Sequence, residues 1–252
     1  MPSESRKIAG LKGKLGGHAF ERQLARFLGL PSESVLGHGR TKTDLKGHPK
    51  HRNINVKNPS GKNTQVFLTP TIRFLEELEP DAPTRAFIGL FFGTSNAEAF
   101  ESRLKRHRIA PSALDPDQEL RRKRVLARNI PPGQIESAVQ WFNTHHRVLF
   151  EVLFKRGYPD WQDEADTLAW AWKKNDCESV RFYPLKDLYQ KFRQGIWKMS
   201  ESGSTLRLED PKKGDPFLHL QMKGSGDKNS EGYHAMMFHM YSYLLMEDPQ
   251  HR

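Results

Sequence analysis

The chain has 252 residues, of which 36% are hydrophobic and 28% charged, a composition that permits a buried core and excludes a wholly disordered protein. Lys and Arg number 40 against 30 Asp and Glu, giving a formal net charge of +10, which favours a polyanionic partner, with nucleic acid first. The single cysteine, Cys177, excludes an internal disulfide framework and a zinc site of paired cysteines. No signal peptide is visible and the longest apolar run, 87–92, is too short for a bilayer, so we expect a cytoplasmic protein without membrane contact.

The N-terminal part of the chain is predicted to form the core of an α/β domain. Residues 1–14 are rich in Ser, Lys and Gly, and we expect them to be flexible. Apolar residues at helical spacing predict a packed helix over 19–28. Glu21 is in register with the apolar stripe of this helix, which puts its carboxylate at the edge of the buried face; placement for the helix dipole is the alternative. The continuous apolar run 86–92 predicts a strand buried on both faces.

Polar and apolar residues alternate in the stretch Asn53–Lys57. In a strand, its two apolar side chains face one way, while Asn55 and Lys57 face the other. Asp44 precedes this stretch in a segment expected to be a loop and a short strand. Asp and Asn oxygens can hold a hard divalent cation such as Mg²⁺, and a lysine two residues further on can stabilise charge that develops on a phosphate. The pattern therefore predicts Asp44 and Asn55 as metal ligands and Lys57 as a catalytic residue; an edge strand with a solvated polar face is the alternative.

The rest of the chain is predicted to mix helices and strands. Pro131-Pro132 begins a helix that runs through Phe142. The other predicted elements are a helical or extended connection over 67–78, a helix over 96–108, a linker over 111–116, strand or helix segments over 147–155 and 163–173, and a loop over 199–204. We expect a single α/β domain over 1–252, with a mixed central sheet flanked by helices.

Residues 217–241 alternate in polarity on either side of a Gly-rich turn, which predicts a β-hairpin. His219, Gln221 and Lys223 share one face of this hairpin, and Asp227 lies in its turn. Gln and Lys side chains recognise base edges, and a Gly-rich turn lets backbone N–H groups approach bases or phosphate. The hairpin therefore predicts a polar ridge that enters a groove of DNA.

Short basic runs occur at several places, including 103–106, 121–124 and 212–213. A cleft lined by such runs would hold phosphates, and Arg121 and Arg122 are the candidates that we single out. Solvated helix faces are the alternative explanation for any one run.

Asp44 with Asn53–Lys57 resembles the catalytic motif of the PD-(D/E)xK nuclease superfamily, and Asn55 stands where most members carry Asp or Glu. The segment Gln-Met-Lys-Gly-Ser-Gly-Asp over 221–227 is similar to a Gln-x-Lys-Gly-x-Gly-Asp segment of the small GCGC- and CCGG-cutting type II restriction endonucleases. Where those enzymes carry Arg, this chain has Met222, which puts the target base sequence in doubt. Weak similarity in the same order extends from about 118 to 243.

The resemblance implies a Mg²⁺-dependent, sequence-specific endonuclease that hydrolyses double-stranded DNA at a short G/C-rich, GCGC-like site. It implies a catalytic core over 16–110 and a DNA-recognition half over 118–243, in an intracellular monomer or homodimer from a prokaryote or phage. In the family, a helix Glu reaches the metal site and a Gln after the catalytic strand enters the DNA, and the matching residues here are Glu21 and Gln65. The alternatives are a structure-specific nuclease like a Holliday-junction resolvase, and a non-catalytic DNA-binding protein in which Asn55 marks a decayed site.

Overall fold

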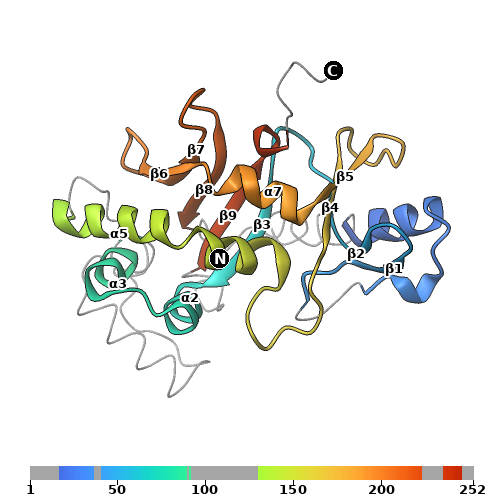
Figure 1. Ribbon diagram of the computed structural model, residues 1–252, viewed down its shortest axis with the longest axis horizontal. Coiled ribbons are helices and arrows are strands. Elements are labelled where there is room, and N and C mark those ends of the chain that lie inside the picture. Colours follow the sequence, from blue (N-terminus) through green and yellow to red (C-terminus); the bar gives the residue numbers. More distant parts are fainter. Residues whose placement is uncertain (1–16, 37–40, 90, 92–129, 223–234, 246–252) are drawn as a thin grey trace, which may run out of the picture.

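The computed structural model describes residues 17–36, 41–89, 91, 130–222 and 235–245. The fold is mixed α/β, as predicted, but its strands form two sheets instead of one central sheet (Figure 1). The segments predicted over 1–14, 96–108 and 111–116 lie outside the described residues. None of the helices within the described ranges is long and apolar enough to cross a bilayer.

The first sheet has four strands in the order β1-β2-β4-β5 and lies at the right in Figure 1. Its strands are β1 (Leu45–His48), β2 (Arg52–Lys57), β4 (Thr167–Ala171) and β5 (Val180–Pro184). The β2–β4 pair is parallel and the other two pairs are antiparallel, so the sheet is mixed. All residues of β4 are buried, because both faces of this central strand are covered.

The second sheet has five antiparallel strands in the order β3-β9-β8-β7-β6. Its strands are β3 (Asn63–Pro70), β9 (Ala235–Tyr241), β8 (Pro216–Met222), β7 (Leu206–Glu209) and β6 (Ile196–Met199). The β8–β9 pair supplies the two strands of the predicted hairpin, and their connection lies outside the described residues. Both sheets thus combine strands from the predicted core, 16–110, with strands from the predicted recognition half, 118–243.

Helices flank both sheets. Residues 17–27 form a helix beside the four-stranded sheet, which confirms the prediction over 19–28 (Figure 1). The predicted helix from Pro131-Pro132 is present as α5. The longer elements are α2 (Thr71–Leu78), α3 (Ala82–Ile88), α5 (Pro132–Thr144), α6 (His146–Phe150), the π-helical segment η4 (Glu151–Lys155) and α7 (Leu185–Phe192); η1 (Ser32–Ser34) and η6 (Ser242–Leu244) are single 3-10 turns.

The strand predicted over 86–92 is wrong, because its first three residues are the last turn of α3 and its other described residues, Gly89 and Phe91, are π-helical. Asp81 caps this helix, since its side chain accepts a hydrogen bond from the Thr84 N–H at 2.8 Å. Phe87 and Ile88 are buried where α3 packs against α5. A short apolar run that is buried on all sides gives the same pattern in a helix as in a central strand, so the cap decides the outcome.

Two apolar clusters hold the sheets in place. The smaller cluster packs the helix 17–27 against one face of the four-stranded sheet, where Ile54 and Val56 of β2 lie. The larger cluster contains Leu168 and Trp170 of β4, together with much of the five-stranded sheet and the helices around it. In the parallel register, Asn55 pairs with Leu168 and Lys57 with Trp170. The polar side chains of β2 therefore lie on the side that faces the larger cluster.

Candidate active site

Asp44 immediately precedes β1 and is hydrogen-bonded to the two residues that flank Asn55 in β2. The antiparallel register pairs Leu45, the first residue of β1, with Ile54. The Asp44 N–H donates to the Ile54 carbonyl at 2.8 Å, and Asp44 Oδ2 accepts from the Val56 N–H at 2.6 Å. The contacts of Asp44 with β2 therefore begin before the first residue of β1, and one backbone and one carboxylate hydrogen bond fix its position.

Asn55 is buried, with 3% of its surface exposed. Its side-chain oxygen Oδ1 is buried and has no hydrogen-bond partner among the residues that the structure describes. An unsatisfied buried polar atom costs about 1–3 kcal/mol, so its presence in a fold calls for a specific reason. A neutral oxygen held ready beside a carboxylate is suited to receive a cation.

Asp44 and Lys57 both lie within electrostatic reach of Glu21. Burial raises the pKa of Glu21 above its ordinary value, and the negative charge of Asp44 raises this pKa further. The hydrogen bond that joins Glu21 Oε2 to His18 Nδ1 at 3.0 Å opposes the rise, as does the positive charge of Lys57. The structure thus brings the Glu21 carboxylate near Asp44 and Lys57. Lys57 follows Asn55 by two residues in β2, and Asp44 is hydrogen-bonded to Val56, the residue between them.

Lys42 is a buried residue near this site that the sequence did not point out. Its ammonium nitrogen donates to the carbonyl oxygens of Leu153 at 2.6 Å and Val66 at 3.1 Å, and it lies 4.1 Å from the ring centre of Phe67. Burial lowers the pKa of Lys42 well below its ordinary value; the charge of Lys57 lowers it further and Asp44 opposes the change. Two irregular backbone positions meet here, because Val66 lies at the bulge of β3 and Leu153 in η4.

The donor set fits a hard divalent cation only if Asn55 takes part. Within the described part of the chain, no three His, Cys, Asp or Glu side chains are grouped to hold a metal ion. Asp44 and Glu21 supply two carboxylates, and Asn55 Oδ1 is the unpaired third oxygen. A cation would neutralise the like charges of the two carboxylates and give the amide oxygen a partner. These three residues are therefore the ones that could hold a metal here.

A single row of residues crosses the five-stranded sheet on the face away from its core. Gln65 of β3 pairs with His239, which pairs with His219. The row continues through β7 and β6, because His219 pairs with Arg207 and Arg207 with Lys198. The structure thus aligns two of the predicted DNA-reading residues, Gln65 and His219, on neighbouring parts of one surface. Gln221 lies two residues along β8 from His219, on the same face.

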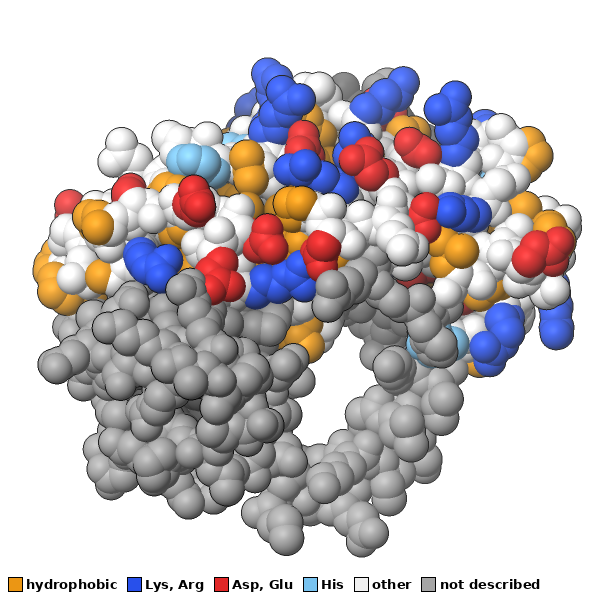
Figure 2. Space-filling view, turned by 90° about the horizontal axis from the view of Figure 1, so that it is seen from below, with side chains coloured by type: hydrophobic (Ala, Val, Ile, Leu, Met, Phe, Trp, Pro, Cys, Tyr) orange, Lys and Arg blue, Asp and Glu red, His pale blue; other side chains and the backbone are white. Residues whose placement is uncertain are grey.

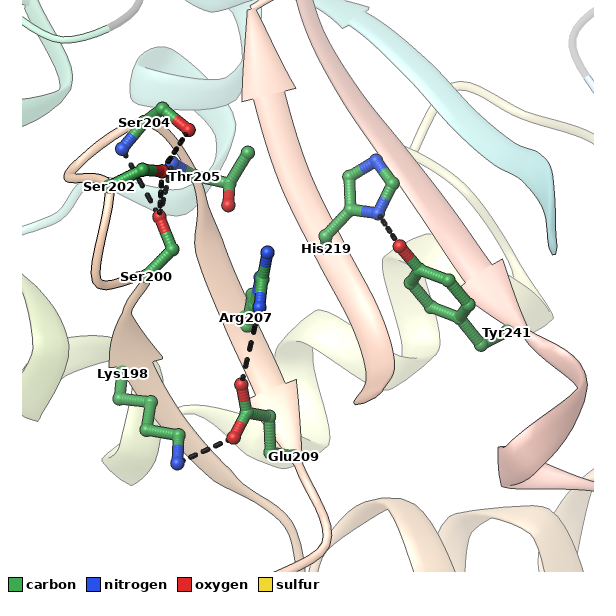
Figure 3. Close-up of polar contacts among 9 residues, drawn as sticks. All are labelled: Lys198, Ser200, Ser202, Ser204, Thr205, Arg207, Glu209, His219 and Tyr241. Atoms are coloured by element: carbon green, nitrogen blue, oxygen red, sulfur yellow. Dashed lines mark hydrogen bonds and ion pairs between the residues drawn. The ribbon is translucent and has the colours of Figure 1, made fainter. Parts of the chain in front are cut away.

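Three residues of this row, Lys198, Arg207 and His219, contact the neighbouring side chains of Glu209 and Tyr241 (Figure 3). His219 Nδ1 shares a hydrogen bond of 2.8 Å with Tyr241 Oη, and the His219 ring stacks on His239 at 4.6 Å. Burial, followed by the charges of His239 and Arg207, lowers the pKa of His219 to about 4. This imidazole is therefore neutral at pH 7. The two cations of the row both approach Glu209, Lys198 at 2.5 Å and Arg207 at 4.0 Å.

Four predicted DNA-contacting residues, Lys223, Asp227, Arg121 and Arg122, lie outside the described residues. On the face shown in Figure 2, Lys and Arg side chains alternate with Asp and Glu across the described part. The described residues therefore form no continuous basic surface on this face.

Comparisons with known proteins find no similar sequence and only weak structural similarity. No protein-family model matches the sequence, and no curated protein matches it either. One similar solved structure is that of the restriction endonuclease MspI in complex with its cognate DNA, with a TM-score of 0.38 and 12% sequence identity, covering 86% of this chain and 75% of that chain.

Proposed function

We propose that this protein is a metal-dependent nuclease of the PD-(D/E)xK type that hydrolyses phosphodiester bonds in double-stranded DNA. The observation that supports this best is the pairing of a fixed carboxylate, Asp44, with a buried and unpaired amide oxygen on Asn55. Lys57 follows on the same face of β2, and its charge acts on Glu21 across the site. What sets Asn55 Oδ1 apart from other unpaired buried atoms of the described residues is its place next to the carboxylate of Asp44, where a bound cation would give it a partner.

Each residue has a distinct role in this proposal. Asp44, Asn55 and Glu21 would hold Mg²⁺, which supplies Lewis-acid stabilisation of the phosphoryl oxygens and lowers the pKa of a water molecule. Lys57 places a positive charge where negative charge develops on the phosphate being attacked. Lys42 holds the segment that carries Asp44 against β3 and η4, and so fixes the carboxylate relative to β2.

For recognition, we propose a type II restriction enzyme that reads a short G/C-rich site. Gln65, His219 and Gln221 support this, because they lie on one face of the five-stranded sheet. Gln65 and His219 are separated by one intervening strand, a spacing of roughly 10 Å. The low pKa of His219 makes it a neutral hydrogen-bonding or stacking group, unsuited to neutralise phosphate. Lys223 and Asp227 would complete the reading surface, and Arg121 and Arg122 would contact phosphates, in the cytoplasm of a prokaryote or of a phage-infected cell.

A non-catalytic DNA-binding protein is the second candidate. It is favoured by the neutral side chain at Asn55, since no three acidic or histidine ligands are grouped within the described ranges. A site with one amide and two carboxylates binds a divalent cation less tightly than one with three carboxylates. The two candidates differ in one observable property, which is hydrolysis.

Incubation of supercoiled plasmid DNA with the purified protein, in Mg²⁺ or in EDTA, tests the proposal. Discrete linear fragments that appear only with Mg²⁺ would support a restriction enzyme. Cutting of a synthetic four-way junction but not of the plasmid would indicate a resolvase instead. Salt-sensitive binding without cleavage in Mg²⁺ or Mn²⁺ would contradict the nuclease and favour the second candidate.

A further inference from the structure

We propose that a basic pocket at the start of β2 binds a phosphorylated nucleotide group, at a place separate from the candidate active site. The pocket has a volume of about 860 Å³, within the range of roughly 300–1,000 Å³ that is common for small-ligand sites. Its walls come from the turn before β2, the start of β4, α6, η4 and α7.

The charge of this pocket is strongly positive. Two carboxylates, those of Glu151 and Asp166, are among its lining residues. The cations that line it are Lys50, Arg52, Arg147, Lys155, Lys186 and Arg193. An excess of cations around one cavity selects for a ligand with several negative charges, and Arg side chains suit phosphate best because they can donate two parallel hydrogen bonds.

Most of this positive charge is not neutralised by the protein. Glu151 accepts from Arg147 Nε at 3.2 Å, and Lys155 pairs with Glu164 at 2.9 Å. The other four cations of the pocket have no ion pair with any residue that the structure describes, and Asp166 forms none with them. Holding several unpaired cations around one cavity is unfavourable by mutual repulsion, and a bound polyanion removes that cost.

The turn that carries Lys50 and Arg52 is held in place before any ligand binds. His48 Nδ1 accepts hydrogen bonds from the Lys50 N–H at 3.2 Å and the His51 N–H at 3.0 Å. Thr167 Oγ1 donates to the His51 carbonyl at 3.2 Å and so ties the turn to β4. Arg52 has φ of 51°, a left-handed conformation that costs a side chain other than glycine about 1–2 kcal/mol. The fold accepts this strain at a residue whose guanidinium group lines the pocket.

An apolar wall completes the pocket and points to a nucleotide instead of phosphate alone. The half-buried ring of Tyr189 lines it, backed by Phe150 and Leu185, which are almost fully buried, and the rings of Phe150 and Tyr189 lie 5.2 Å apart. Nucleic-acid bases stack on such aromatic surfaces with about 1–3 kcal/mol per base. A ligand that carries both a base and phosphates would use the two kinds of wall together.

The pocket is distinct from the candidate active site. Arg52 begins β2 and Lys57 ends it, which puts the two residues roughly 16 Å apart along an extended strand. The proposal therefore does not depend on nuclease activity. Its chemistry is shared by two sources, a free nucleoside triphosphate and the nucleotides of a DNA strand.

Binding of fluorescent mant-ATP to the whole protein tests this inference, with inorganic triphosphate as competitor. Lys186→Gln with Arg193→Gln removes two exposed cations of the pocket, and Arg52→Asn removes a third with a residue that tolerates positive φ. Each cation removed should weaken mant-ATP binding by about tenfold or more, because it removes a charge-assisted hydrogen bond to phosphate. Lys173→Gln with Lys174→Gln, which removes two exposed cations from the β4–β5 turn, should leave binding unchanged.

A short DNA duplex added to the mant-ATP complex identifies the source of the phosphates. If DNA displaces mant-ATP from the wild type, and the pocket variants bind this DNA more weakly, the pocket is assigned to DNA. If DNA does not displace mant-ATP, the pocket is assigned to a free nucleotide. Asp44→Asn should leave mant-ATP binding intact, so this inference and the proposed nuclease activity fail independently. The inference is overturned if the wild type does not bind millimolar mant-ATP, if the pocket variants and the control pair lose binding equally, or if Asp44→Asn abolishes it.

Discussion

Replacement of Lys42 by Met should destabilise the protein more at high pH than at neutral pH. The change leaves the Val66 and Leu153 carbonyls without their donor, at a cost of about 1–3 kcal/mol each, or about 2–6 kcal/mol together. The substitution also removes the desolvation cost of a buried charge, because Lys42 carries an ammonium group and only 5% of this residue is exposed. A neutral amine keeps two N–H donors, which is the number that the two carbonyls require.

The pKa of Lys42 fixes the sign of the pH dependence. Its pKa in the folded protein is lowered well below 10.5, its usual value, so the unfolded chain binds more protons between these two values. The stability of the wild type therefore gains from Lys42 as the pH rises from the lowered pKa toward 10.5, and the Met variant has no such gain. We expect the full loss of about 2–6 kcal/mol near pH 10 and a smaller loss at pH 7.

Urea unfolding followed by tryptophan fluorescence at pH 7 and pH 10 measures both differences. Comparison of the variant with the wild type at each pH cancels the titration of all other groups. Lys174→Met, at an exposed lysine, is the matched control and should show no difference at either pH. A gap between Lys42→Met and the wild type that is constant or narrower at pH 10 would refute the reasoning.

Three further changes test other parts of the account. Gly157→Ala places a Cβ 2.2 Å from Trp161 at a φ of +69°, whereas Gly214→Ala, at a φ of +73°, meets nothing within 4 Å. Calorimetry should show that Gly214→Ala lowers the free energy of unfolding by about 1 kcal/mol and that Gly157→Ala lowers it more. Equal losses of stability would count against the packing of Trp161 on Gly157. Asn55→Asp is nearly isosteric and should keep the melting temperature within a few degrees while changing the ratio of Mg²⁺- to Mn²⁺-supported cleavage; an unchanged ratio would remove Asn55 from the metal site. Gln65→Ala or Gln221→Ala should cost about 1–3 kcal/mol of discrimination at one base pair, whereas Arg122→Ala should weaken binding to all sequences, and competition between cognate and random duplexes separates these effects.

Local patterns in the sequence predicted some elements well. The helix 17–27 follows from helical spacing with a Gly after it, and α5 from a proline pair at its start. The same rules gave a strand where α3 is, because an apolar run buried on every side carries no period. The division into two sheets was beyond reach, since the parallel β2–β4 pair joins residues more than 100 positions apart.

In the candidate site too, the residues that a local sequence pattern positions could be predicted, and the residue that distant contacts position could not. Alternation over 53–57 was enough to place Asn55 and Lys57 on one face of β2, and the hydrogen bonds of Asp44 with Ile54 and Val56 place Asp44 next to Asn55. Lys42 could not be singled out, because its partners Val66 and Leu153 lie 24 and 111 residues away. Its burial depends entirely on tertiary contacts, and nothing in its neighbourhood distinguishes it from the other lysines of that segment.

The most direct test of the central claim is the rate of Mg²⁺-dependent plasmid cleavage by Asp44→Asn and Lys57→Ala. Asn at position 44 keeps an oxygen acceptor for the Val56 N–H, so it removes the charge while preserving the hydrogen bond. Asp176→Asn, whose carboxylate likewise accepts from a backbone N–H, and Lys62→Ala are the matched controls. The account predicts that both site variants lose at least about a hundredfold in rate while both controls cleave like the wild type. Wild-type rates from Asp44→Asn and Lys57→Ala would contradict it.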